Sequence, residues 1–148
     1  EQYPALAPLL EEEDWAVCEP RLGPFVARIL PAGRAFAVRL GLPFTLHQDT
    51  PVIAPNMLES IWCAVNRITR NGGVLGPEYR ISAYEALKAV TVHAAWQYAL
   101  EGERGSLAPG KTADLVLLDR DPTAVEPMAI RDIRVLETIR EGETLYRA

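Results

Sequence analysis

The sequence predicts an α/β fold, because helical and strand-like patterns follow one another along the chain. A helix is predicted from Pro31 to Gly41, since proline suits the first turn of a helix and glycine the left-handed position that ends one. The stretch Phe44–Gln48 follows directly and alternates apolar with polar residues, which is the period of a strand. Beyond Gly102 the pattern changes to short strands. Such helix-to-strand connections are typical of α/β proteins.

Two further helices are predicted between the strand-like stretch and Gly102. The first has Asn56 as its cap and Glu59 three residues later, the pattern of a capping box, and is expected to end at Asn71–Gly73. The second starts with the same pattern at Ser82 and is expected to run to Gly102. Apolar residues recur at helical spacing in both, namely Leu58, Ile61, Trp62, Val65, Ile68, Ala83, Leu87, Val90, Ala94 and Tyr98.

Strands are predicted in the last third of the chain. Asp114–Leu118 is a short apolar run between two proline-containing turns. Val135–Arg140 and Thr144–Arg147 are predicted to form a terminal hairpin. Strands with one apolar face need more sheet to pair with, and residues 1–40 offer no obvious strand. We therefore expect the missing strands to come from elsewhere, either the same polypeptide or a partner chain.

Composition narrows the classes of function. The 148 residues carry a net charge of −5 and no Lys/Arg run, which argues against nucleic-acid binding. No apolar run has the length of a membrane span, and the acidic run Glu11–Asp14 precedes any signal-peptide-like stretch. Cys18 and Cys63 fit neither a zinc motif nor a disulfide framework. These observations favour a cytoplasmic protein, with Cys63 as a small core residue.

From about Pro31 onward the chain resembles the C-terminal part of metal-dependent amidohydrolases, in the branch that acts on N-acyl and formamide groups. The most specific match is Gly105–Asp119, which has the pattern Gly-Ser-Leu-x-Pro-Gly-Lys-x-Ala-Asp-Leu. Three shorter segments and four spaced residues also match: Phe44–Val52, Ile81–Leu87, Thr91–Ala95, and Val135, Thr138, Gly142 and Tyr146. The segments occur in the order and at the spacing of the family.

The resemblance implies a fold. The chain would be the C-terminal segment of a (β/α)₈ TIM-type barrel plus the terminal strands of a small β-sandwich domain. Residues 1–103 would form the end of the barrel, with the eighth strand near residues 43–49, and residues 104–148 the strands of the small domain. The family's His-x-His and its other histidine ligands have no counterpart here, because His47 and His93 are the only histidines.

Asp49 is the main candidate for a catalytic residue and a metal ligand. Barrel active sites lie at the C-terminal ends of the strands, where Asp49 is expected. The resemblance matches Asp49 to an aspartate that contacts a divalent metal, takes a proton from the attacking water and returns it to the leaving amine. The alternative is that Asp49 only accepts backbone N–H bonds in the Asp-Thr-Pro turn. With the resemblance, we favour the catalytic role.

His47 shares the predicted strand face with Asp49. It is either a partner of the carboxylate or substrate, or a buried neutral histidine bonded to a neighbouring strand, and the sequence does not separate these roles. Direct metal ligation by His47 is excluded from our prediction. His93 lies in a predicted helix, where packing or capping is the better interpretation.

Other polar and aromatic residues are given structural roles. Lys111 and Asp114 belong to the matched motif, but a turn and a strand entry explain them. We expect Arg67 and Arg70 on a solvated helix face rather than on a substrate. Helical spacing makes Trp62, Trp96 and Tyr98 core residues in preference to a substrate box.

The sequence therefore predicts part of a metal-dependent hydrolase of carbon–nitrogen bonds other than peptide bonds. Its substrate would be a small amide-type molecule, and its cofactor one or two divalent ions. Zinc fits best, because histidine and carboxylate ligands suit it. Homo-oligomer formation stays open. The alternative is a non-catalytic or degenerate module that assembles with a partner chain.

Overall fold

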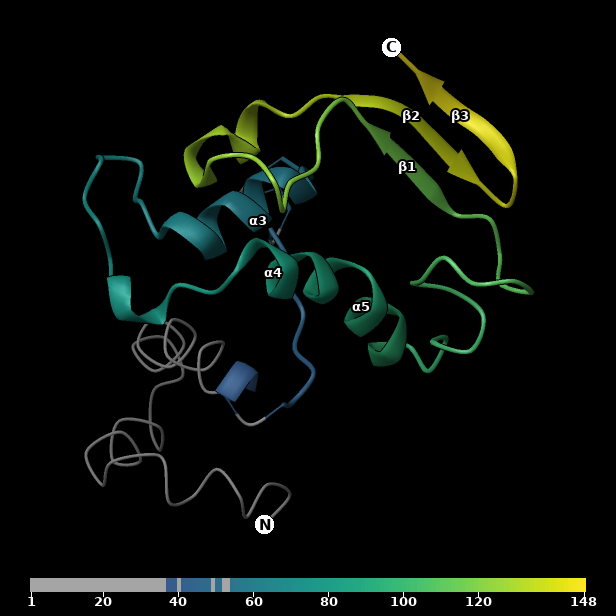
Figure 1. The fold of residues 1–148 in the computed structure, drawn as a ribbon, viewed down its shortest axis with the longest axis horizontal. Coiled ribbons are helices and arrows are strands. Elements are labelled where there is room, and N and C mark those ends of the chain that lie inside the picture. Colours follow the sequence, from purple (N-terminus) through teal and green to yellow (C-terminus); the bar gives the residue numbers. More distant parts are fainter. Residues whose placement is uncertain (1–36, 40, 49, 52–53) are drawn as a thin grey trace.

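The computed structural model describes residues 37–39, 41–48, 50–51 and 54–148. Three helices, two 3₁₀ helices and a three-stranded sheet make up the longer elements of this part of the chain. Figure 1 shows the helices at the centre and the sheet at the upper right, with the C-terminus at the end of the last strand. Gly41 has φ of +66°, so the predicted left-handed position is confirmed.

Helix α3 spans Met57–Asn66 and begins as the sequence predicts. The side chain of Asn56 accepts hydrogen bonds from the backbone N–H groups of Leu58 and Glu59, which satisfies two unpaired donors of the first turn. The predicted end at Asn71–Gly73 is wrong. Arg67 takes a left-handed conformation, with φ of 57°, and stops the helix there.

A short reversal follows α3 where the sequence analysis expected more helix. Ile68 and Val74 form an isolated antiparallel bridge, and the predicted stop residues occupy the turn between them. The backbone N–H of Gly73 donates to the hydroxyl of Thr69 at 3.1 Å, and Gly72 has φ of +81°. Glycine adopts such a φ without strain, so these residues suit a turn as well as a helix end.

The second predicted helix is divided into α4, Ala83–Val90, and α5, Val92–Gln97. Ser82 caps α4 as predicted, accepting from the N–H of Glu85. The break lies at Thr91, whose φ of −123° and ψ of −95° are not helical. Its hydroxyl donates to the carbonyl of Leu87 at 2.7 Å, a side-chain bond that competes with regular helix bonding. The single helix to Gly102 is therefore a wrong prediction.

The sheet consists of β1, Leu115–Leu118, β2, Val135–Arg140, and β3, Glu143–Arg147, in the order β1-β2-β3. Both pairings are antiparallel. The hairpin and the strand before it are confirmed. Glu141 and Gly142 join β2 to β3 with φ of 52° and 85°, as expected of a tight turn that matches the twist of a hairpin.

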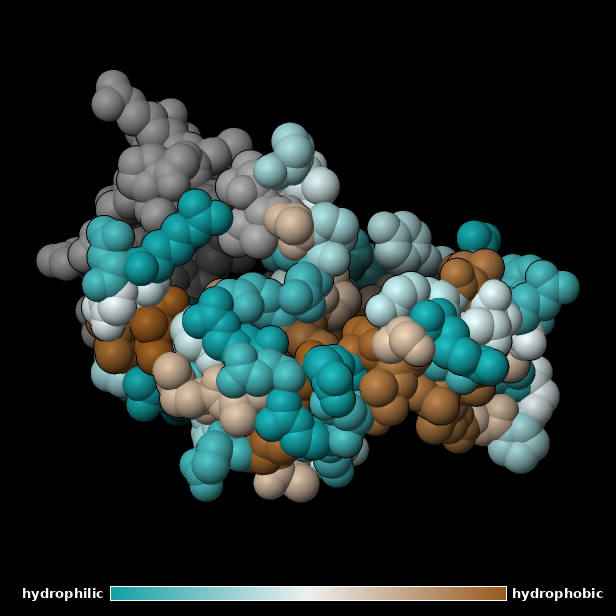
Figure 2. Space-filling model, turned by 90° about the horizontal axis from the view of Figure 1, so that it is seen from above, coloured by the Kyte–Doolittle hydropathy of each residue, from teal (hydrophilic) through white to brown (hydrophobic). Residues whose placement is uncertain are grey.

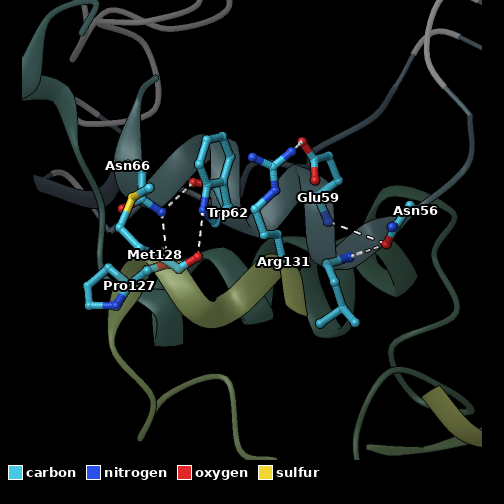
Figure 3. A network of polar contacts seen from close by, with 8 residues as sticks. Asn56, Glu59, Trp62, Asn66, Pro127, Met128 and Arg131 are labelled. Atoms are coloured by element: carbon cyan, nitrogen blue, oxygen red, sulfur yellow. Dashed lines mark hydrogen bonds and ion pairs between the residues drawn. The ribbon is translucent and has the colours of Figure 1, made fainter. Parts of the chain in front are cut away.

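The 3₁₀ helix η3, Pro127–Asp132, lies between β1 and β2 in the sequence and packs against α3. The sequence pattern does not predict this helix. The Trp62 indole N–H donates to the carbonyl of Met128 at 3.1 Å, and the Asn66 amide donates to the carbonyl of Pro127 at 2.9 Å (Figure 3). The other 3₁₀ helix is η2, Pro77–Tyr79. A buried cluster lies between η3 and the helices: Ile61, Trp62, Ala64, Val65, Ile81, Ala86 and Ile130.

The predicted strand Phe44–Gln48 is not a strand in this structure. Residues 42–48 have no regular secondary structure, and within the described residues the sheet draws its strands only from Leu115 onward. A strand needs a paired neighbour for its N–H and carbonyl groups, which the described part of the chain does not provide here. Phe44 and Leu46 nevertheless pack against the buried cluster. The alternation therefore agrees with the packing of Phe44 and Leu46 and the exposure of His47, without strand pairing.

The sheet exposes apolar side chains. Figure 2 views the molecule from above and shows hydrophobic surface on the right, the side on which Figure 1 places the sheet. The large apolar residues of the strands that are exposed are Val116, Leu117, Leu136, Leu145 and Tyr146. Among the helices that the structure describes, none has both the length and the apolar character to cross a bilayer.

Candidate functional site

The segment 42–48, which leads to Asp49, lies against helices α3 and α5. The ring nitrogen Nδ1 of His93, in α5, is 3.2 Å from the carbonyl oxygen of Phe44. The two rings meet edge to face, with centroids 5.8 Å apart. The hydroxyl of Thr45 donates to the side-chain oxygen of Gln97 at 2.8 Å. His93 thus has a packing role, as the sequence indicates, and α5 holds the first half of the segment.

Gln48 holds the other end of the segment. Its side-chain amide donates to the carbonyl of Asn56 at 2.9 Å and to the hydroxyl of Ser60 at 2.7 Å. Only 8% of the residue is exposed. Gln48 was not among the predicted site residues, although the alternating pattern places it on the same face as Phe44 and Leu46. That shared face was the signal for a buried amide.

His47 is exposed, between the half-buried Leu46 and the buried Gln48. This agrees with the period of two, which sends it to the face opposite its neighbours. Asp49 lies outside the described residues. The catalytic and metal-binding role of Asp49, and the role of His47 beside it, therefore stay predictions.

The described residues do not by themselves fit a divalent metal. They contain no group of three His, Cys, Asp or Glu side chains placed to hold one ion. His93 faces the carbonyl of Phe44 and packs on its ring. A zinc site needs three or four protein ligands, and the described residues do not supply such a set.

Some side-chain predictions near the site are wrong. Trp62 is buried as expected, but Trp96, within α5, and Tyr98, just after it, are exposed, Tyr98 to 74%. Cys63 is exposed rather than in the core. Its helix buries the face that carries Ile61, Trp62, Ala64 and Val65 instead.

Arg67 is buried and does not lie on a solvated face. Its side-chain Nε donates to the carbonyl of Leu75 at 2.6 Å, across the reversal that follows α3. Burial lowers the pKa of the Arg67 guanidinium, and the nearby Glu78 carboxylate opposes that shift. The contact has a structural explanation, because it fixes the chain where the helix ends.

Lys111 and Asp114 have the structural roles that the sequence indicates. The Lys111 ammonium donates to the hydroxyl of Ser106 at 2.7 Å and to the backbone carbonyls of Glu101 and Arg104. Asp114 accepts the backbone N–H of Glu141 at 2.9 Å and pairs with Arg104, which also binds the Glu141 carboxylate at 3.1 Å. The Glu141 N–H, followed by the charge of Arg104, keeps the pKa of Asp114 below its usual value. These bonds join the loop before β1 to the β2–β3 turn.

Comparison with known proteins gives matches over most of the chain. The model of the amidohydrolase family matches residues 4–146. An N-substituted formamide deformylase from Arthrobacter pascens is 35% identical over 106 residues, covering 72% of this chain and 20% of that protein. The putative amidohydrolase YtcJ of Bacillus subtilis is 30% identical over 101 residues, covering 66% of this chain and 19% of that protein.

The fold is also similar to a solved one. The crystal structure of an amidohydrolase from Thermotoga maritima aligns with a TM-score of 0.56 and 25% identity, over 80% of this chain and 26% of that one. The chain spans about a fifth of the length of the formamide deformylase and of YtcJ. The resemblance found in the sequence is confirmed by these matches: the chain belongs to the amidohydrolase family.

Proposed function

We propose that the protein containing this chain is a hydrolase of carbon–nitrogen bonds other than peptide bonds, with small amides or formamides as substrates. The family match over residues 4–146 carries the proposal. The similarity to an N-substituted formamide deformylase supports this substrate class. Because the chain spans about a fifth of such relatives, the activity is proposed for the complete protein.

Asp49 is the residue of this chain that we assign to the chemistry. Its carboxylate would accept a proton from the attacking water and return it to the leaving amine. A divalent metal, with zinc the best fit to histidine and carboxylate ligands, would supply the positive charge that lowers the pKa of water at such a site. Asp49 would contribute one carboxylate ligand, and one or two ions would be held mostly by residues outside this sequence.

The same proposal includes the architecture of the complete protein. Phe44–Gln48 would be the eighth strand of a barrel, paired with strands from the rest of the polypeptide or from a partner chain. The similarity to an amidohydrolase of which this chain covers 26% supports this. The apolar residues that the small sheet exposes would be covered in the same way, because exposed apolar patches mark surfaces that contact other protein.

Replacement of Asp49 by asparagine in the full-length protein tests the proposal. The amide keeps the shape of the side chain but cannot accept the proton, so kcat on N-formyl and N-acyl amines should fall about 10²–10⁴-fold. Asp121→Asn is the matched control, because the Asp121 carboxylate accepts the N–H of Thr123 in an Asx-turn. Wild-type kcat in Asp49→Asn would support the turn-capping role of Asp49 instead. A wild-type protein inactive on the whole panel would favour the non-catalytic module.

A further inference from the structure

The residue immediately before Asp49 has the most buried polar side chain of segment 42–48. The Gln48 side chain lies against the first turn of α3, where its nitrogen contacts three groups. It donates to the carbonyl of Asn56 and to the hydroxyl of Ser60, and it lies 3.8 Å from the sulfur of Met57. Breaking the contact would leave the buried amide of Gln48 without these partners, which is unfavourable.

The two residues to which Gln48 donates, Asn56 and Ser60, are part of the N-terminal end of α3. Asn56 caps α3 through its side chain, and its carbonyl also accepts the N–H of Ser60 at 3.2 Å. Ser60 belongs to the helix whose inner face forms the buried cluster. Gln48 is thus tied to one of the better-packed elements in the described part of the chain.

The Gln48–Asn56 hydrogen bond joins the two residues that flank positions 49–55 in the sequence. A cross-link at the base of a short segment reduces the conformations available to everything within it. Asp49 is the first residue inside that segment, one peptide unit from the buried amide. Catalytic groups need such restraint, because a displacement of about 1 Å can cost about 10²-fold in rate.

We infer that Gln48 is a positioning residue for Asp49. Its amide holds residue 48 against the N-terminal turn of α3, directly before Asp49 in the sequence. This inference rests on the proposed function, since it assigns Gln48 a role in the same reaction. A merely structural Gln48 would contribute to stability alone.

The test uses Gln48→Met in the full-length protein. Methionine keeps the length and burial of the side chain but has no N–H donor. Gln48→Glu is the second variant, because a carboxylate can donate neither to the carbonyl of Asn56 nor to the hydroxyl of Ser60, and could only accept from that hydroxyl.

The matched control is Asn66→Leu, which removes another buried amide from the opposite end of α3. The Asn66 amide donates to the carbonyls of Trp62 and Pro127 at 3.0 and 2.9 Å. Leucine has the same branched shape without the donors. The control removes the same kind of interaction from the same helix, far along the sequence from Asp49.

Two measurements are made on each variant: kcat and KM on the amide panel, and hydrogen–deuterium exchange of the peptide covering residues 49–55. We expect kcat to fall roughly 10–100-fold in both Gln48 variants, as for residues that orient a catalytic ligand, with KM little changed. Exchange of peptide 49–55 should become faster in the same variants. Asn66→Leu should lower the melting temperature while leaving kcat and this peptide unchanged.

The outcomes separate the two proposals. If the wild-type protein is active and kcat is unchanged in both Gln48 variants, the positioning role is overturned and the proposed function stands. Equal loss of kcat in Asn66→Leu also overturns it, because the effect would then be general destabilisation. An inactive wild-type protein overturns the proposed function, and the exchange of peptide 49–55 then decides whether Gln48 restrains that segment.

Discussion

The guanidinium of Arg131 lies over the indole ring of Trp62, with its central carbon 4.3 Å from the ring centroid (Figure 3). The same group donates to the carboxylate of Glu59 at 3.0 Å. Arg131 belongs to η3, whereas Trp62 and Glu59 lie one turn apart on α3. A single side chain thus combines a cation–π contact with an ion pair between two elements far apart in the sequence.

Replacement of Arg131 by alanine should therefore lower the free energy of unfolding by about 1–2 kcal/mol, the sum of a cation–π contact and a partly exposed ion pair. Urea denaturation of the full-length protein measures it. Lys88→Ala is the control, because Lys88 pairs with Glu85 and lies near Tyr84 within one helix. The control should cost less than about 0.5 kcal/mol. Equal losses in the two variants would contradict a contact that joins elements.

Ile130, also in η3, should be among the most sensitive positions to truncation. Its exposure is 1%, within the buried cluster that it shares with Ile61 and Trp62. Ile130→Ala removes apolar contacts and leaves a cavity, so we expect a loss of about 2–5 kcal/mol in the free energy of unfolding. Leu107→Ala, at a residue 85% exposed, should stay within about 0.5 kcal/mol of wild type. A small effect at Ile130 would indicate that η3 does not pack on α3 in solution.

The acid sensitivity of the protein should depend in part on Asp119. The backbone N–H of Arg134 donates to its carboxylate at 2.9 Å and the Arg134 side chain at 3.0 Å, and these bonds lower the pKa of Asp119. A carboxyl whose pKa is lower folded than unfolded stabilises fully above the unfolded value, about 3.9. That contribution is lost as the pH falls through the folded value.

Asp119→Asn should therefore be less stable than wild type near neutral pH, and the two proteins should converge once the pH is well below about 3.9. Urea denaturation at a series of pH values measures the difference. A difference that stayed constant down to the lowest pH would show that the amide disturbs packing and not ionisation.

The features that could be predicted from the sequence are the local ones. The caps at Asn56 and Ser82 bond to residues two or three positions away, and the Glu141–Gly142 turn is likewise decided by its own residues. The end of α3 could not be predicted, because the buried Arg67 adopts a left-handed conformation that glycine normally takes. η3 was missed for a related reason, since its stability depends on the distant α3.

At the candidate site, too, the local pattern could be predicted from the sequence and the long-range contacts could not. The alternating pattern of residues 44–48 was recognised, and it correctly separates the packed Phe44 and Leu46 from the exposed His47. Strand pairing did not follow from that pattern, because pairing needs neighbours that the described residues do not supply. The contact of Gln48 with Asn56 and Ser60 was also missed, because it depends on how the segment packs on α3.

Neither histidine of this chain is expected to bind the metal of the proposed enzyme. His93 already faces the carbonyl of Phe44 and packs on its ring, and within the described residues it belongs to no group of side chains that could hold a metal ion. His93→Asn keeps a donor for that carbonyl, and His47→Ala removes the exposed imidazole. Elemental analysis of the full-length variants should find the wild-type metal content in both, whereas Asp49→Ala should reduce it. Loss of metal in a folded His93→Asn protein would make this histidine a ligand. Unchanged metal in Asp49→Ala would remove Asp49 from the ligand set.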